Sequence, residues 1–263
     1  MILIGCVLSI LMGLVLGNIG AGGSILILPI LVYFIGLTPT LATSYSLIIV
    51  GLTALVGSIR YIQKRHVNIW VSLIFGIPSL LAVYCTRRYF MPIFPDSMQL
   101  GSVTFTKDFI IMILFSFLMF LAAYLMIFSK EIKLYNNNQY IKYLLIVVQG
   151  SIVGFFTGII GAGGGFLIIP ALVVFSGLNM KTAIGSSLLI IFIKSFFGFI
   201  GDIQSDINID YSILSIISMC TIFGILIGSS ISEYINSNNL KKYFGYFIAI
   251  LSFVIIISES INN

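Results

Sequence analysis

Charged residues are scarce in this sequence. Of its 263 residues 8% are charged, against about 25% in a soluble domain, while 59% are hydrophobic. A soluble fold could not cover so much apolar surface, whereas a lipid bilayer can act as its solvent. Because apolar runs recur along the whole chain, the sequence predicts an all-α, polytopic membrane protein.

Histidine and cysteine are also rare, which limits catalytic and metal chemistry. The chain has 1 His and 3 Cys. Cys6, Cys85 and Cys220 lie in apolar runs without the spacing of metal ligands, so we expect buried thiols there. Neither a His-Glu-x-x-His pattern nor a Ser/His/Asp set is present. We therefore expect no enzyme, no cofactor and no bound metal.

The chain contains an internal repeat at an offset of 141 residues. Gly17–Pro29 matches Gly158–Pro170, and 17 of the 31 positions from Gly17 to Leu47 are identical without a gap. Such a match indicates a duplication. We predict one transmembrane domain over residues 1–263, with repeat 1 at about 1–130 and repeat 2 at about 141–263.

Each repeat contains five apolar runs. They cover about 2–16, 24–36, 41–59, 69–86 and 109–128 in the first repeat, and about 141–157, 166–177, 183–200, 211–230 and 241–257 in the second. Run 2–16 lacks the basic n-region and the cleavage site of a signal peptide, so we expect it to be retained. Three runs per repeat can span about 30 Å of hydrocarbon, whereas 24–36 and 166–177 reach only about 20 Å as helices.

The positions of Lys and Arg predict the topology. If the chain reverses after every run, three basic residues share one face and nine share the other. Leaving out the short runs gives six and six, so the positive-inside rule favours nine against three, with both termini outside the cytoplasm. An odd number of reversals per repeat inverts the repeats, which is typical of transporters. The larger set is Arg60, Lys64, Arg65, Lys130, Lys133, Lys142, Lys181, Lys241 and Lys242, and the smaller is Arg87, Arg88 and Lys107.

The aligned ends of the third runs agree with this inversion. Arg60–Arg65 aligns with Gly201–Asp206, where Ile-Gln is kept and the basic segment becomes an acidic one. We interpret both segments as loops on opposite sides of the membrane. The basic residues therefore belong to loops, and no nucleic-acid partner is expected from the net charge of +5.

Glycine is concentrated just before each short run, in Gly20–Gly23 and Gly161–Gly165. The spacing fits neither a dinucleotide fingerprint nor a P-loop. We expect helix N-termini at Ser24 and Gly165 to meet near the bilayer midplane and to hold one anion at their free N–H groups. Close helix packing is the structural alternative. Membrane-spanning segments and re-entrant hairpins both fit the short runs.

Polar side chains near these motifs complete the predicted site. Serines that begin apolar runs could cap a helix or bind an oxyanion. Lys194, inside a long run, either faces a cavity as an anion counter-charge or extends to the interface. Arg87 and Arg88 either line an outer anion vestibule or simply anchor the helix at the membrane interface. The predicted substrate-binding set is Asn18, Gly20, Gly22, Gly23, Ser24, Ser44, Ser46, Gly161, Gly163, Gly164, Gly165, Ser186, Ser187 and Lys194.

The motifs resemble those of the sulfite exporter TauE/SafE family. The pattern Gly-x-x-Gly-x-Gly-Gly-Gly-x-x-x-x-Pro ends at Pro170, and Ala183–Leu188 reads Ala-x-Gly-Ser-Ser-Leu. The resemblance covers essentially the whole chain and implies a carrier for sulfite, thiosulfate, sulfoacetate or another small sulfur-containing or organic anion. The first copy of the Gly-Ser-Ser-Leu turn departs from the family pattern, because Tyr45 occupies a small-hydroxyl position.

We therefore expect a secondary transporter, an exporter of a small anion, in the inner or plasma membrane. An anion channel and a non-catalytic membrane partner subunit are the alternatives, and a membrane-embedded enzyme fits least. The expected partners are the anion and the lipid bilayer. A coupling proton or ion and a homo-oligomer stay open.

Overall fold

The computed structural model describes residues 2–100, 103–128, 139–161, 163–203, 210–231 and 237–262. The long helices are α1 (Ile2–Ile19), α3 (Pro39–Gln63), α4 (Ile69–Cys85), α6 (Lys107–Phe128), α7 (Gln139–Ile160), α9 (Met180–Ile203), α10 (Tyr211–Ile231) and α11 (Ser237–Asn262). The shorter pieces are η1 (Ala21–Leu26), α2 (Ile27–Pro29), η2 (Ile30–Ile35), η3 (Thr86–Phe90), α5 (Met91–Ile93), α8 (Gly165–Pro170) and η4 (Ala171–Phe175). Strands β1 (Ser97–Leu100) and β2 (Val103–Thr106) form an antiparallel hairpin.

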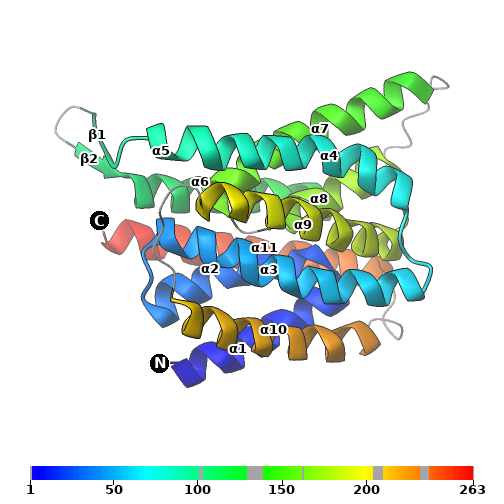
Figure 1. The fold of residues 1–263 in the computed structure, drawn as a ribbon, viewed down its shortest axis with the longest axis horizontal. Coiled ribbons are helices and arrows are strands. Elements are labelled where there is room, and N and C mark those ends of the chain that lie inside the picture. The colour runs from blue at the N-terminus through cyan, green and yellow to red at the C-terminus, as the bar shows by residue number, and fades with distance from the viewer. Residues whose placement is uncertain are drawn as a thin grey trace.

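The long helices form a bundle with two different ends (Figure 1). The hairpin end carries β1, β2, the start of α1 and the end of α11. The basic end carries the turn between α3 and α4, which contains Lys64, Arg65 and His66. Both α1 and α3 begin at the hairpin end, so the short segments between them return the chain to that end (Figure 1). The predicted alternation of five runs matches this path, while the inversion of the repeats in a membrane stays a prediction.

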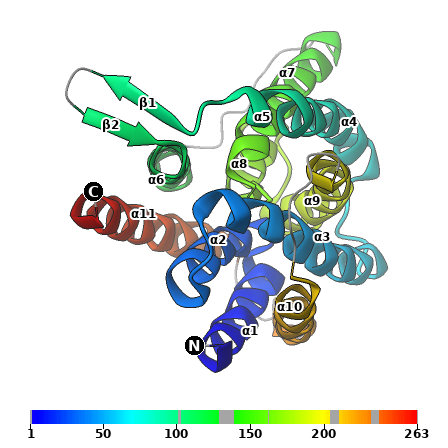
Figure 2. The same ribbon diagram turned by 60° about the vertical axis from the view of Figure 1, so that its left-hand side comes forward.

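Helices from the two halves alternate in space. Figure 2 shows α1 beside α10, α4 beside α7 and α3 beside α9. In the repeat α1 corresponds to α7 and α10 to α4, so the first two pairs are equivalent to each other. The third pair joins two helices, α3 and α9, that correspond to each other. Helices α3 and α9 are antiparallel, because Gly185 at the start of α9 contacts His66 while Gly198 near its end contacts Leu47. They are also the most buried of the long apolar helices that the structure describes.

Glycines bring the paired backbones into direct contact. A Cβ on Gly13 would lie 2.2 Å from the carbonyl oxygen of Thr221, and one on Gly150 would lie 2.5 Å from that of Phe75. No side chain fits in such a gap, so only glycine allows these distances. The contacts involve Gly13, Gly17, Gly224 and Gly228 between α1 and α10, and Gly150 and Gly154 between α4 and α7.

Polar side chains fix where the helices begin. Asp108 of α6 accepts hydrogen bonds at Oδ1 from the backbone N of Thr40 (2.8 Å) and from its hydroxyl (2.6 Å), in the first turn of α3. The preceding Pro39 suits the first helical position, where no N–H partner is needed. Asn68, Asn179 and Asp210 accept from backbone N–H groups at the starts of α4, α9 and α10 in the same way.

The two short apolar runs form broken helices. In the first half the chain passes from the 3₁₀ segment η1 through α2 to the π-helical η2, and in the second from α8 to the π-helical η4. Both π segments follow a proline, Pro29 or Pro170, directly. Proline removes a backbone donor from the helical ladder, and the wider π turn accommodates the loss. The second short helix begins at Gly165 as predicted, whereas the first begins at Ala21 rather than Ser24.

The outer surface is apolar, as a lipid environment requires. Six described helices are long and apolar enough to cross a membrane. Large side chains such as Trp70 (77% exposed) and Met219 (72% exposed) point outward. The predicted all-α membrane fold is confirmed, and the small hairpin between α5 and α6 is an addition to it.

Two local expectations need correction. Cys85 is exposed on α4, and Cys6 and Cys220 are half-buried, so the expected burial of the three thiols is wrong; an apolar thiol is tolerated on a surface that faces lipid. Arg60–Gln63 and Gly201–Ile203 form the last turns of α3 and α9 rather than loops. Helical backbone satisfies its own hydrogen bonds, so these helices continue beyond their apolar runs. Residues 204–206 lie outside the described part of the chain.

Candidate functional site

The two glycine-rich turns meet inside the bundle. A Cβ on Gly163 would lie 3.4 Å from Cβ of the buried Ser24 and 2.5 Å from Cγ1 of Val50, near the middle of α3. Gly163 has a φ of +64°, in the left-handed region that favours glycine. The beginnings of the two broken helices therefore touch at mid-length of α3. This is the expected convergence, and its depth in a bilayer stays a prediction.

The residues that open each turn pack against the opposite half. A Cβ on Gly20 would lie 2.5 Å from Cγ2 of Ile184, and one on Gly161 would lie 2.2 Å from the carbonyl oxygen of Thr43. Thr43 and Ile184 are equivalent positions of the repeat. Each turn is thus closed by the first part of the other half's central helix.

The first turn reaches further toward the basic end than we expected. Tyr61, two residues before the end of α3, donates a 2.9 Å hydrogen bond from its hydroxyl to the carbonyl oxygen of Gly17. The end of α1 therefore reaches the level of the last turn of α3 before the chain turns. Only Ser24, later in the motif, lies at the middle of α3.

Lys194 places a cation at the second turn. Its side chain is 0% exposed, and Nζ donates a 2.7 Å hydrogen bond to Oγ1 of Thr157. A Cβ on Gly164 would lie 2.9 Å from Nζ, so the ammonium approaches the backbone of the turn directly. Within the described part of the chain, no carboxylate pairs with Lys194. The side chain does not extend to the surface of the bundle, which agrees with the interior orientation and not with the interfacial one.

The predicted serines hold the turns and helix starts together. Oγ of Ser46 lies 2.6 Å from the carbonyl oxygen of Gly161 and 2.8 Å from that of Thr43, and its one O–H donates to either, so Ser46 links the second turn to α3. Ser187 bonds within its own helix. Ser186 accepts at Oγ from the backbone N of Asn68 at 2.9 Å, next to the start of α4. These two serines support helices rather than the contact between the turns.

The remaining predicted residues divide between the contact and its surroundings. Asn18 donates from Nδ2 to Leu14 within α1, and its Oδ1 is buried without a hydrogen-bond donor. Gly22 and Gly23 form part of η1, and Gly165 is the first residue of α8. Ser44 is buried, its hydroxyl has no partner among the described residues, and it lines a cavity next to Arg87.

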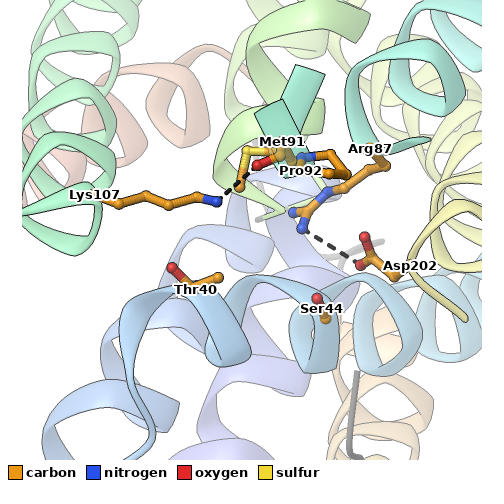
Figure 3. A pocket seen from close by; sticks show the side chains of 7 residues that line it. All are labelled: Thr40, Ser44, Arg87, Met91, Pro92, Lys107 and Asp202. Atoms are coloured by element: carbon orange, nitrogen blue, oxygen red, sulfur yellow. Dashed lines mark hydrogen bonds and ion pairs between the residues drawn. The ribbon is translucent and has the colours of Figure 1, made fainter. Parts of the chain in front are cut away.

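This cavity has a volume of about 180 Å³ and lies toward the hairpin end. Figure 3 shows Arg87 and Lys107 approaching it from opposite sides, with Thr40 and Ser44 on α3 and Asp202 on α9. Met91 and Pro92 close it from the side of α5. The cavity brings two cations and two hydroxyls together with one carboxylate.

Arg87 is the most unusual group in this cavity. The residue is 2% exposed, and Nη1 donates a 3.0 Å hydrogen bond to Oγ1 of Thr43. Nη1 also lies 3.4 Å from Oδ2 of Asp202, which itself has an exposed side-chain fraction of 3%. Among the residues that the structure describes, none accepts a hydrogen bond from its Nε or Nη2. A Cβ on Gly161 would lie 2.4 Å from Nη2, so Arg87 touches the same turn that Lys194 approaches.

Comparison with known proteins gives the family. The model of the family described as "Sulfite exporter TauE/SafE" matches residues 5–255. The chain belongs to the TauE/SafE family. It is 33% identical over 184 residues to a "Probable membrane transporter protein" of Xylella fastidiosa strain 9a5c, covering 68% of this chain and 65% of that relative's length. It is 28% identical over 218 residues to the "Probable membrane transporter protein YunE" of Bacillus subtilis, covering 73% and 76% of the two chains. No solved structure matches.

For this TauE/SafE protein, sequence patterns locate the turns but not the cavity. Lys194 and the glycines could be found because each departs from an otherwise apolar background. Asp202 could not, because it was assigned to a loop and lies 115 positions from Arg87 in the chain. Thr157 and Thr40 carry no signal beyond being hydroxyls in apolar runs. The signal for Arg87 was its place on the face that is poor in basic residues.

Proposed function

We propose that this TauE/SafE protein is a secondary transporter that exports a small anion, with sulfite or another sulfur-containing or organic anion as substrate. The anion binds where the two glycine turns meet, with Lys194 as its counter-charge. The observation that carries this proposal is the fully buried ammonium of Lys194 at the second turn. The names of the relatives, as probable membrane transporters, support it.

A lysine in this position is costly without an anion. A charged residue at the centre of a membrane helix costs about 2.5–3.5 kcal/mol on insertion scales. A single neutral acceptor, Oγ1 of Thr157, offsets only part of that cost. A bound anion provides the missing opposite charge. Gly164 lets the ammonium of Lys194 lie close to the backbone of the turn. The same charge would repel cations from the site.

Two alternatives make different kinetic predictions. A channel would give flux that does not saturate and that no gradient of a second ion can drive uphill. A non-catalytic partner subunit would give no flux when the chain is reconstituted alone. An enzyme is the weakest alternative, because the sequence holds one His and no catalytic motif.

The test is flux of labelled sulfite, thiosulfate and sulfoacetate in proteoliposomes. We expect saturable flux of at least one anion by the unmodified protein. Lys194→Met should reduce it at least about tenfold, since one unit charge at about 4 Å from the anion contributes several kcal/mol at an intermediate dielectric. Lys64→Met removes the same charge at the basic end and should leave the flux nearly unchanged. Unaltered flux in Lys194→Met, at equal protein abundance, would refute the assigned role of Lys194.

A further inference from the structure

The cavity between Arg87 and Lys107 has the composition of a second anion site. We propose that it binds a small monovalent oxyanion, and that Asp202 sets this charge preference by occupying one side of Arg87. This inference rests on the proposed function, because the cavity then lies on the path between the hairpin end and Lys194. Arg87 and Lys194 approach opposite parts of one turn, at Gly161 and Gly164 respectively.

The guanidinium of Arg87 is only partly satisfied. An arginine has five N–H donors in a planar fork, and planar oxyanions accept from two of them at once. Here Nη1 has Thr43 and Asp202 as neighbours, while the donors on Nε and Nη2 have no acceptor in the described part of the chain. Burying charged donors without acceptors is unfavourable, so this fork is preorganised for an anion.

Asp202 balances the positive charge of Arg87 without forming paired hydrogen bonds to its guanidinium. Its Oδ2 lies 3.4 Å from Nη1 and accepts no hydrogen bond from the residues that the structure describes. The usual two-bond arrangement between an arginine and a carboxylate is therefore absent. The carboxylate balances one charge and leaves the donors on Nε and Nη2 for a ligand.

Other groups of the cavity can bind the remaining oxygens of the ligand. The hydroxyl of Ser44 is buried, and no described residue forms a hydrogen bond with it. Lys107 uses one donor of its ammonium for the carbonyl oxygen of Met91 at 2.7 Å, which leaves two N–H groups. Thr40 holds Asp108 by two hydrogen bonds, and this carboxylate does not line the cavity.

The charges select the class of ligand. Two cations and one carboxylate line the cavity, so one negative charge makes the occupied site neutral. A divalent anion would leave an excess negative charge in a buried space, which is costly. A volume of about 180 Å³ accommodates an anion of a few heavy atoms. Formate is a suitable monovalent probe, and thiosulfate is a suitable divalent one.

The test measures binding of formate and thiosulfate to purified protein by calorimetry, in the Lys194→Met background so that the inner site is silent. We expect formate to bind more tightly than thiosulfate. Asp202→Asn raises the net charge of the cavity by one and should shift the affinity ratio toward thiosulfate at least about tenfold. Asp96→Asn, an exposed carboxylate near the hairpin, is the matched control and should leave the ratio unchanged.

A double variant removes both charges of the buried pair. Arg87→Gln with Asp202→Asn leaves no unpaired buried charge, so it tests binding even where a single variant fails to fold. We expect it to lose both probes. Unchanged binding in this variant, or an unchanged ratio in folded Asp202→Asn, would overturn the inference.

Flux separates this inference from the proposed function. If the unmodified protein moves no anion in proteoliposomes, the proposed function fails. If it does move an anion and the double variant does so with the same KM, the transporter assignment stands and the Arg87 site is wrong.

Discussion

Gly163→Ala tests whether the contact between the two broken helices is as close as the structure places it. The backbone at position 163 has a φ of +64°. The new methyl group would lie 2.5 Å from Cγ1 of Val50. A left-handed conformation costs an L-residue about 1–2 kcal/mol. Overpacking of a full core costs about 1–3 kcal/mol more. The variant should therefore lose about 2–5 kcal/mol of its free energy of unfolding.

Gly177→Ala provides the matched control. Gly177 has a φ of +69°, and a Cβ there meets nothing within 4 Å. Its substitution carries the backbone cost of about 1–2 kcal/mol without the steric one. Thermal unfolding of purified protein in detergent compares the two, with about 2–4 °C of Tm expected per kcal/mol at this chain length.

A second background isolates the contact itself. Val50→Ala removes the methyl group that the new Cβ would contact. In this background the difference in Tm loss between Gly163→Ala and Gly177→Ala should therefore become smaller. Equal Tm losses for the two glycine variants in the unmodified background would refute the close contact.

Three further predictions concern topology and local support. Cysteine tags at both termini should react with an impermeant reagent in intact cells, and protection until lysis would reverse the topology. Ser46→Ala leaves the carbonyl oxygen of Gly161 without its 2.6 Å donor and should lower the free energy of unfolding by about 1–3 kcal/mol, seen as a lower Tm. Ser58→Ala removes a hydrogen bond within its own helix and should lower Tm less. Asp108→Ala should cost about 1 kcal/mol, because the start of α3 loses its acceptor, and Asp108→Asn should lower Tm less.

The helices could be predicted because the bilayer leaves few choices. Every backbone group in lipid must be bonded within the chain, so an apolar run of sufficient length becomes a helix. The duplication then predicted that the two glycine-rich turns meet, and the structure places Ser24 beside Gly163. Lys194 stood out because few charges occur in such runs.

The ends of helices and the pairs between them were harder to predict. Asp202 was assigned to a loop because the apolar run stops at residue 200, yet α9 continues to Ile203. Its partner, Arg87, comes from the other half of the chain, and a single sequence contains no record of such pairs. The hairpin of β1 and β2 was missed for a similar reason, since its strands of 4 residues each lie between two long apolar helices.

The glycine contacts between α1 and α10 and between α4 and α7 interlock the two halves. In each pair one helix comes from each half, and the backbone of one occupies space that a side chain of the other would need. Neither half can complete a close-packed pair by itself. The two products of a gene split in the segment 129–138 would therefore have to fold together, each serving as the template for the other.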